Sequence, residues 1–358
     1  MKINRVNKLI EKMNEQSLDQ MLVTSPADLF YLTGKWFHPG ERMIALYINV
    51  NGNHKLIVNK LFPIYEDLGV EILWYTDTDN PIALLSTVVN KNKTLGVDKN
   101  WPSHFLIKLM ENNIGKAFVN SSVILDRIRM IKDEEEINLM RKSSQLNDKV
   151  MLDLWKVLEE GKSEKYFASV LTEIYEKHGV NKLSFKPIIA TSPNGADPHH
   201  GTGNDTLKKG QSIVLDIGGI YNSYCSDMTR TVFFGAEPSE RHAKIYNIVK
   251  NANLKGIEAV KPGAKFSDVD KAARNYIESE GYGEFFTHRT GHSIGIETHD
   301  FGDVSSINDD ELKPGMIFSI EPGIYLKDDI GVRIEDLVLV TKDGCEVLNK
   351  VTKEITIL

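Results

Sequence analysis

The chain has 358 residues, of which 41% are hydrophobic and 26% charged, so it is long enough for two cores and too apolar to be mainly disordered. Its formal net charge of −7 and pI near 5.9 give no overall attraction for nucleic acid or anionic lipid. Two cysteines are too few for a disulfide framework, and no apolar run resembles a secretion signal or a membrane span, so we expect a cytoplasmic protein.

The first part of the chain alternates between helix-like and strand-like segments, which predicts a small α/β domain over residues 1–125. Apolar residues recur at helical spacing from Val6 to Met13. Asn51-Gly52 separates two strand-like segments and indicates a hairpin turn. The expected strands are residues 44–50, 55–58, 71–75, 94–97 and 116–119, with a helix at residues 101–110.

A charged segment that begins at Asp126 marks the start of a second domain, which we place at residues 126–358. Asp133 can cap a helix whose first turn is acidic. Apolar and small residues then recur every three or four positions. A long helix with one buried face is therefore expected, ending near Gly161.

The second domain contains a weak internal repeat. A predicted helix bounded by glycines occupies residues 161–179 and recurs at residues 263–281, which is 102 residues later. A glycine turn followed by an apolar strand that ends in an acid also recurs, at residues 210–216 and 315–321. Another acid follows in each copy, so each half delivers two carboxylates: Asp216 and Asp227, then Glu321 and Glu335.

These four carboxylates are expected to converge, and a buried cluster of like charges needs compensation. At an effective dielectric constant of about 20, two unit charges about 4 Å apart repel by about 4 kcal/mol. Divalent cations or bound protons must therefore accompany the cluster. His292, in Thr290-Gly291-His292, is the expected imidazole ligand. Oxygen ligands with one imidazole suit Mn²⁺, with Co²⁺ or Zn²⁺ as alternatives.

Five motifs around these residues resemble the metal-binding motifs of the creatinase and aminopeptidase family. They occur in the family's order and are Leu215-Asp216-Ile217-Gly218, Ser226-Asp227-Met228-Thr229-Arg230-Thr231, Thr290-Gly291-His292, Ile320-Glu321-Pro322-Gly323 and Arg333-Ile334-Glu335-Asp336. The resemblance implies an α+β "pita-bread" fold, in which two duplicated halves enclose the site, in agreement with the repeat. It also implies an N-terminal α/β domain of the creatinase N-terminal, ribonuclease H-like type.

The resemblance further implies two divalent metal ions. It makes Asp216 a chelating ligand of one ion, Asp227 and Glu335 bridges between both ions, and His292 and Glu321 ligands of the other. A water held between two such ions has its pKa lowered toward about 7, which supplies hydroxide as the nucleophile. Glu321 or a neighbouring acid is expected to accept the proton of this water.

Three more histidines match the family's pattern, and the resemblance implies that they hydrogen-bond the substrate carbonyl and the tetrahedral intermediate. They are His199, His288 and His299. His200 is an alternative to its neighbour His199. We favour His199 because it lies eleven positions before Gly210, as in the family.

Two arginines and one loop are candidates for contacts with the substrate. Arg333 and Arg289 each offer a guanidinium fork, either to a substrate carboxylate or in a salt bridge to a ligand acid. His38 lies in a loop that resembles a family loop able to close over a site, including across a dimer. Ser293 stands where the family usually has glycine after the metal histidine, and we expect it to narrow the pocket slightly.

The resemblance leads us to expect an Xaa-Pro dipeptidase (prolidase) that acts on short proline-containing peptides as a homodimer. An X-Pro bond is a tertiary amide without an N–H, which peptidases that grip an extended backbone handle badly. The alternative is an Xaa-Pro aminopeptidase (aminopeptidase P) acting on longer peptides. Methionine aminopeptidases need no front domain of this kind, and creatinase lacks the full metal set. A non-catalytic peptide-binding module is a further alternative.

Overall fold

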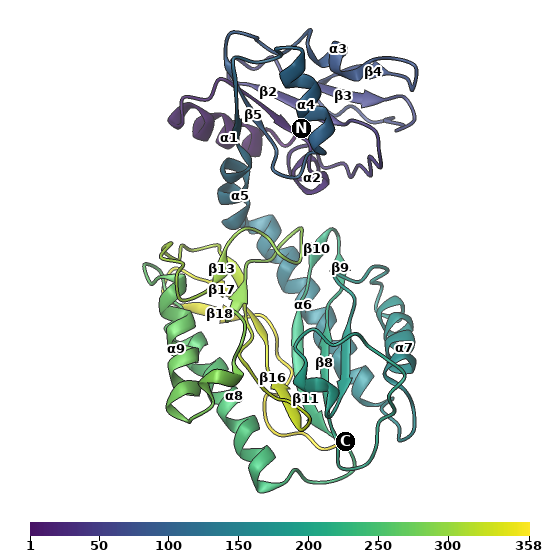
Figure 1. Cartoon of the computed structure of the whole chain (residues 1–358), viewed down its shortest axis with the longest axis vertical. Coiled ribbons are helices and arrows are strands. Elements are labelled where there is room, and N and C mark those ends of the chain that lie inside the picture. The colour runs from purple at the N-terminus through teal and green to yellow at the C-terminus, as the bar shows by residue number, and fades with distance from the viewer. The chain divides into compact units, whose positions relative to one another are not determined.

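The computed structural model describes all 358 residues, which form two compact units (Figure 1). Unit 1 comprises Met1–Ile128 and unit 2 comprises Arg129–Leu358. The chain passes from one to the other within helix α5 (Ser122–Met130). The boundary expected between residues 125 and 126 stays a prediction. None of the helices combines the length and the apolar character that crossing a bilayer requires.

Unit 1 is built on a six-stranded mixed sheet with the strand order β4-β3-β2-β1-β5-β6. Strand β1 pairs antiparallel with β2 and parallel with β5. The strands are β1 (Gln20–Val23), β2 (Ala45–Asn49), β3 (Lys55–Asn59), β4 (Glu71–Tyr75), β5 (Thr94–Val97) and β6 (Ala117–Asn120). The helices preceding α5 are α1 (Ile3–Glu15), α2 (Pro26–Thr33), α3 (Pro81–Leu85) and α4 (Ser103–Glu111).

The hairpin expected in unit 1 is confirmed. Strands β2 and β3 run antiparallel, with Tyr47 opposite Lys55. Gly52 lies in the turn with φ of +82°, a left-handed conformation that glycine adopts without strain. Its N–H donates to the carbonyl of Asn49 at 3.0 Å, which closes the turn.

The first half of unit 2 packs a three-stranded antiparallel sheet, in the order β11-β8-β7, against two helices. Asp133 and Glu136 form a capping box at the start of the long helix α6, as the acidic first turn predicts. The elements are α6 (Glu134–Trp155), α7 (Glu164–Lys177), β7 (Ile188–Thr191), the 3₁₀ helix η1 (Asn194–Ala196), β8 (Ser212–Ile217), β9 (Ile220–Tyr221), β10 (Tyr224–Cys225) and β11 (Met228–Phe233).

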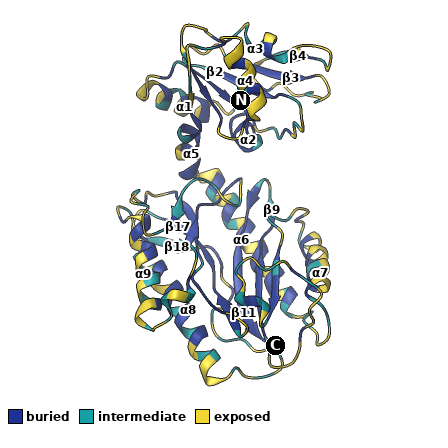
Figure 2. Cartoon of the chain, viewed as in Figure 1, coloured by how far each residue is buried: buried dark blue, intermediate teal, exposed yellow.

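The second half of unit 2 has the same plan, two helices against a sheet in the order β14-β17-β18. Strands β14 and β17 are buried and β18 is partly buried, whereas helices α8 and α9 expose their outer faces (Figure 2). The elements are α8 (Glu240–Ala259), α9 (Phe266–Ser279), the 3₁₀ helix η2 (Gly283–Phe285), β12 (Gly291–His292), β13 (Asp303–Val304), β14 (Ile317–Ile320), β15 (Gly323–Leu326), β16 (Ile330–Arg333), β17 (Asp336–Val340) and β18 (Cys345–Val347).

The repeat read from the sequence corresponds to equivalent elements in the two halves. Helices α7 and α9 begin and end 102 residues apart. Strands β8 and β14 begin 105 residues apart, and β11 and β17 begin 108 residues apart. The four glycines that bound the two helices all have positive φ, which explains why glycine recurs at these positions.

One helix boundary differs from the expectation. Helix α6 ends at Trp155, well before Gly161. Val157 and Leu158 donate their N–H groups three residues back, so the last turn tightens and the chain leaves the helix. Gly161 instead donates to the carbonyl of Leu207, a tertiary contact that helical periodicity cannot reveal.

Arg230 of β11 joins the two halves of unit 2. Its side chain is 1% exposed and donates to the carbonyls of Thr229 and Glu335 at 2.9 and 2.6 Å. It also pairs with the fully buried Asp336 at 2.7 Å and bonds the carbonyl of Val351 near the C-terminus. A buried ion pair of this kind costs little only while all its hydrogen bonds are made.

We expect Arg230→Met to lower the free energy of unfolding of the metal-free protein by about 3–5 kcal/mol, because it leaves Asp336 buried next to carbonyls without donors. Arg241→Met is the control, since Arg241 pairs with Asp329 on the surface, where a pair contributes about 1 kcal/mol or less. Urea denaturation measures both variants. Equal losses in the two variants would contradict the role given to Arg230.

Candidate metal centre

Two of the predicted acids come from neighbouring strands of the first half. Asp216 lies near the end of β8, and Asp227 directly precedes β11, with which β8 pairs antiparallel. The side chains are buried, and the Oδ1 atom of each has no hydrogen-bond partner. Because an orphaned carboxylate oxygen is costly in the interior, both oxygens fit coordination of a cation.

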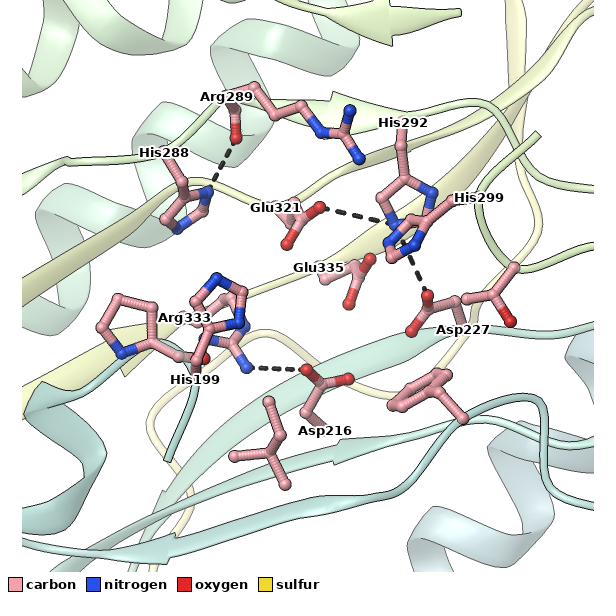
Figure 3. Close-up of a pocket in the computed structure, with 14 residues that line it drawn as sticks. His199, Asp216, Asp227, His288, Arg289, His292, His299, Glu321, Arg333 and Glu335 are labelled. Atoms are coloured by element: carbon pink, nitrogen blue, oxygen red, sulfur yellow. Dashed lines mark hydrogen bonds and ion pairs between the residues drawn. The ribbon is translucent and has the colours of Figure 1, made fainter. Parts of the chain in front are cut away.

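The other two acids come from the second half. Glu321 directly follows β14, and Glu335 lies between β16 and β17. Glu335 is tied to the first half, because its N–H donates to the carbonyl of Thr229 and its Oε2 accepts from the Thr229 hydroxyl at 2.8 Å. All four acids point into one cavity, as Figure 3 shows.

His292 completes the cluster, and the glycine before it makes this possible. A Cβ at Gly291 would lie 1.9 Å from the carbonyl oxygen of Ser319, so only glycine lets β12 approach β14 this closely. The Nδ1 of His292 lies 3.2 Å from the carbonyl of Ser293 and therefore donates to it. The lone pair of Nε2 then faces the acids.

The distances around His292 fit a metal ion. Its Nε2 lies 3.6 Å from Asp227 Oδ2 and 3.6 Å from Glu321 Oε1, so an acceptor faces two acceptors (Figure 3). Ligand atoms of Asp227, His292 and Glu335 all lie within 4.8 Å of one another. Carboxylates with one imidazole are suitable ligands for a divalent ion such as Mn²⁺, Co²⁺ or Zn²⁺.

The pKa shifts of these residues also support a metal site. Burial, followed by the carboxylates of Glu335 and Asp216, raises the pKa of Asp227 well above its ordinary value. Burial likewise raises the pKa of Glu335 well above its ordinary value and that of Glu321 to about 7. Burial and then His299 lower the pKa of His292 to about 3, so its imidazole is neutral, as a ligand must be. Divalent cations would remove the repulsion among these carboxylates.

The cavity has a volume of about 390 Å³. Its polar lining includes the five predicted ligands and the five other residues predicted in this domain: His199, His288, Arg289, His299 and Arg333. Phe185, Ile188 and Pro198 supply an apolar wall that the sequence analysis did not identify. The remaining predicted residue, His38, lies in unit 1 between α2 and β2, where its ring stacks on Trp36. Its contact with substrate stays a prediction.

Arg333 forms the salt bridge that the sequence left open as one of its two roles. Its side chain is buried, and Nη2 lies 2.6 Å from Asp216 Oδ2. Nε donates to the Thr229 hydroxyl and Nη1 to the hydroxyl of Tyr325 at 3.1 Å. These contacts commit the guanidinium to the protein, so it is not free for a bidentate contact with a ligand.

His288, which lines the cavity, forms a hydrogen-bonded pair with Tyr325, which does not. His288 Nδ1 lies 2.7 Å from the carbonyl of Arg289 and must donate to it. Burial and then Arg333 lower the pKa of His288 to about 4, so the ring is neutral and Nε2 accepts from the Tyr325 hydroxyl at 2.8 Å. Both ring nitrogens therefore have partners within the protein. The predicted role of His288 toward a substrate stays a prediction.

The adjacent histidines His199 and His200 have different surroundings. His199 is exposed at the cavity, whereas the Nε2 of His200 lies 2.7 Å from the buried Glu164 carboxylate. His199 therefore lines the cavity and His200 does not, and the role of His199 toward a substrate stays a prediction. The ring of His299 packs on His292 with centroids 4.3 Å apart. Burial and then the Arg289 charge lower the pKa of His299.

Arg289 and Ser293 also differ in what they face. The guanidinium of Arg289 is exposed at the cavity and makes no hydrogen bond or ion pair within the protein. Ser293 does not line the cavity. Its hydroxyl is buried against Gly302, where a Cβ would lie 2.8 Å away. The slight narrowing of the pocket expected from Ser293 is therefore not seen.

Sequence reasoning missed Tyr325 and Glu164. Tyr325 carried a weak signal, since it lies in β15 only four positions after Glu321. Glu164 carried none, because an acid in the first turn of a helix is ordinarily a surface residue. Its partners in the structure lie at least 27 positions away in the sequence.

Comparison with known proteins agrees with this geometry. The model of metallopeptidase family M24 matches residues 138–342, and that of the creatinase/prolidase N-terminal domain matches residues 5–131. An uncharacterized peptidase of Staphylococcus aureus (strain MW2) is 38% identical over 360 residues, covering 98% of this chain and 100% of that protein.

Solved structures extend the likeness. A prolidase from Thermococcus sibiricus has a TM-score of 0.93 at 32% identity, covering 100% of this chain and 99% of that one. A dipeptidase from Pyrococcus horikoshii OT3 has a TM-score of 0.92 at 34% identity, covering 99% and 100%. The α+β fold is thus a pita-bread domain preceded by a creatinase-type N-terminal domain, and the chain belongs to metallopeptidase family M24.

Proposed function

We propose that this metallopeptidase is an Xaa-Pro dipeptidase whose site holds two divalent ions. The proposal depends on the guanidinium of Arg289, which lies at the cavity and has no partner within the protein. In a dipeptide the C-terminal carboxylate lies close to the scissile bond, so this guanidinium can bind it. Similarity to a prolidase and a dipeptidase supports it. An aminopeptidase P would bind a longer peptide, whose carboxylate lies farther from the scissile bond.

Five residues would hold the ions: Asp216, Asp227, His292, Glu321 and Glu335. The orphaned Oδ1 atoms of the two aspartates and the lone pair of His292 Nε2 support this assignment. We take Mn²⁺ as the expected ion, with Co²⁺ or Zn²⁺ as alternatives. When bound, the ions supply a water that ionises near neutral pH and polarise the scissile carbonyl.

The chain's own groups would orient the peptide and move protons. Glu321 accepts the proton of the attacking water, since its carboxylate lies beside His292 at the cavity. His199 and His299 donate to the scissile carbonyl and to the oxyanion that develops from it. His288 and Tyr325 hold the backbone of Arg289 in place. A homodimer, a cytoplasmic location and a substrate contact from His38 remain part of the proposal through the family resemblance.

Metal-stripped protein should hydrolyse Ala-Pro and Leu-Pro only after Mn²⁺ is added, and should leave Ala-Pro-Ala and Met-Ala intact. Chromatography of the amino acids and peptides released from each substrate measures the reaction. Cleavage of Ala-Pro-Ala would instead favour aminopeptidase P. Hydrolysis of none of the peptides with Mn²⁺, Co²⁺ or Zn²⁺ would favour a peptide-binding module.

Asp227→Asn should lower kcat on Leu-Pro by about a hundredfold or more, because even residues that only support metal ligands contribute about 10–100-fold. Calorimetry with Mn²⁺ should show weaker binding, while circular dichroism stays unchanged. Asp343→Asn, on an exposed turn, is the matched control. Full activity of Asp227→Asn would show that Asp227 is not a metal ligand.

Arg289→Met should raise KM for Leu-Pro by about 10- to 100-fold, since a hydrogen bond to a charged group contributes about 1.5–3 kcal/mol. Leu-Pro amide lacks the carboxylate, so the variant and the unmodified enzyme should bind it equally. Arg241→Met serves as a surface control. The same loss on the amide as on the acid would exclude a carboxylate contact at Arg289.

A further inference from the structure

The loop of residues 193–203 carries His199 to the cavity with little regular structure of its own. Only the 3₁₀ helix η1 (Asn194–Ala196) interrupts it. On the cavity side, Arg333 Nη1 donates to the carbonyl of Pro198 at a long 3.4 Å. A histidine that must be held within about 0.5 Å of its productive position needs a firmer support.

The firmer support is the carboxylate of Glu164, the first residue of α7. Its side chain is 0% exposed. Oε2 accepts from His200 Nε2 at 2.7 Å and from the Gly203 N–H at 2.8 Å. Oε1 accepts from the N–H and hydroxyl of Thr191 at 2.9 and 3.1 Å and from Asn194 Nδ2 at 3.1 Å. These contacts hold the strand before the loop, its beginning and its end.

The Glu164 side chain is stable in its ionised form at this buried position. Burial alone would raise the pKa of Glu164, but the donors, His200 first and Asn194 next, lower it below its ordinary value. The position at the start of α7 adds the favourable field of the helix N-terminus. Glu164 is therefore ionised at neutral pH and accepts five hydrogen bonds, which a neutral side chain of the same shape cannot do.

Neither Glu164 nor His200 lines the cavity. Both residues are connected to it through backbone that they hold: His200 directly follows His199 in the loop, and Glu164 also bonds Thr191 of β7, the strand that carries Ile188 of the cavity wall. The N–H of His199 donates to Asp197 Oδ1 at 3.0 Å. An influence of Glu164 on hydrolysis would therefore act through the backbone of the loop or of β7, and the loop is the segment that carries His199.

We propose that Glu164 is a positioning residue whose buried carboxylate, by gripping His200 and Gly203, fixes the 193–203 loop and so holds His199 at the substrate. The inference rests on the proposed function, because it takes His199 as a group that contacts the peptide. The second histidine of the His199-His200 pair is then a support for the first.

The test compares Glu164→Gln, His200→Leu and His200→Gln for hydrolysis of Leu-Pro with Mn²⁺. Glu164→Gln turns an amide N–H toward donors, and His200→Leu removes a donor, so both should lower kcat by about 10- to 100-fold, the cost of a misplacement near 1 Å. His200→Gln keeps an N–H near the position of Nε2 and should restore most of the activity. Mn²⁺ affinity should not change, because no predicted ligand lies on the loop.

Two matched controls are available on or beside the same helix. Glu173→Gln removes an exposed charge of α7. His178→Leu removes the histidine of a comparable pair, whose Nε2 lies 2.8 Å from Asp153 at the surface. Both should retain the kcat of the unmodified protein. A loss as large as that of Glu164→Gln would overturn the inference, since the effect would then not be specific to the loop.

A double-mutant cycle separates positioning from general support. In a His199→Ala background, Glu164→Gln should lower kcat no further, because its effect runs through the missing imidazole. Equal losses in both backgrounds would overturn the inference. Should Glu164→Gln not fold, His200→Leu is carried through the same cycle.

Hydrogen exchange of the metal-free protein keeps this inference separate from the proposed function. Amides in residues 193–203 should exchange faster in Glu164→Gln than in Glu173→Gln. If the unmodified protein cleaves no peptide, the proposed function fails, and exchange alone decides the role of Glu164. Faster exchange confined to the loop then supports the grip on it, and unchanged exchange overturns it.

Discussion

The burial of four carboxylates in one cavity is the constraint on which the rest of unit 2 depends. Asp216, Asp227, Glu321 and Glu335 come from equivalent strands of two halves, and neither half could bury its pair without the other. Arg333 neutralises Asp216 from one side, and Thr229 bonds Glu335 from the other. Arg230 then fixes the backbone of Thr229 and Glu335 at their shared edge. Divalent ions would neutralise the negative charge that these contacts leave unbalanced.

A surrounding layer of polar contacts gives the cavity its rigidity. Two histidines of the cavity have partners outside its lining: the Tyr325 hydroxyl bonds the ring of His288, and the Ser319 hydroxyl accepts from the backbone N–H of His292. Asp300 follows His299 in the sequence. Asp300 in turn pairs with the buried Lys132 and Arg129. Catalytic groups held by such partners need no reorganisation during a reaction. Arg289 has no such partner for its guanidinium, which fits a group that waits for a ligand.

Much of this could be read from the sequence, and the limits have physical causes. The repeat, the strands that end in acids and the capping box at Asp133 are local patterns, so the sequence alone is enough to predict them. The end of α6, the salt bridge of Arg333 to Asp216 and the grip of Glu164 on His200 depend on partners 36 to 117 positions away. No local pattern encodes these contacts, because the side chains concerned are ordinary for the elements in which they lie. The hydroxyl of Ser293 likewise lies against Gly302 and not at the cavity, where we expected it.

The widening offset between the two halves suggests how such a fold diversifies. From 102 residues at the helices, the offset grows to 105 and then 108 at the strands, so the second copy is longer than the first in the connections between these elements. Those connections carry all the imidazoles at the cavity: His199 in the first copy, and His288, His292 and His299 in the second. The equivalent strands of both copies thus share the acids, whereas the connections between them differ. The unequal loops are the parts in which a lineage could change its substrate without changing those acids.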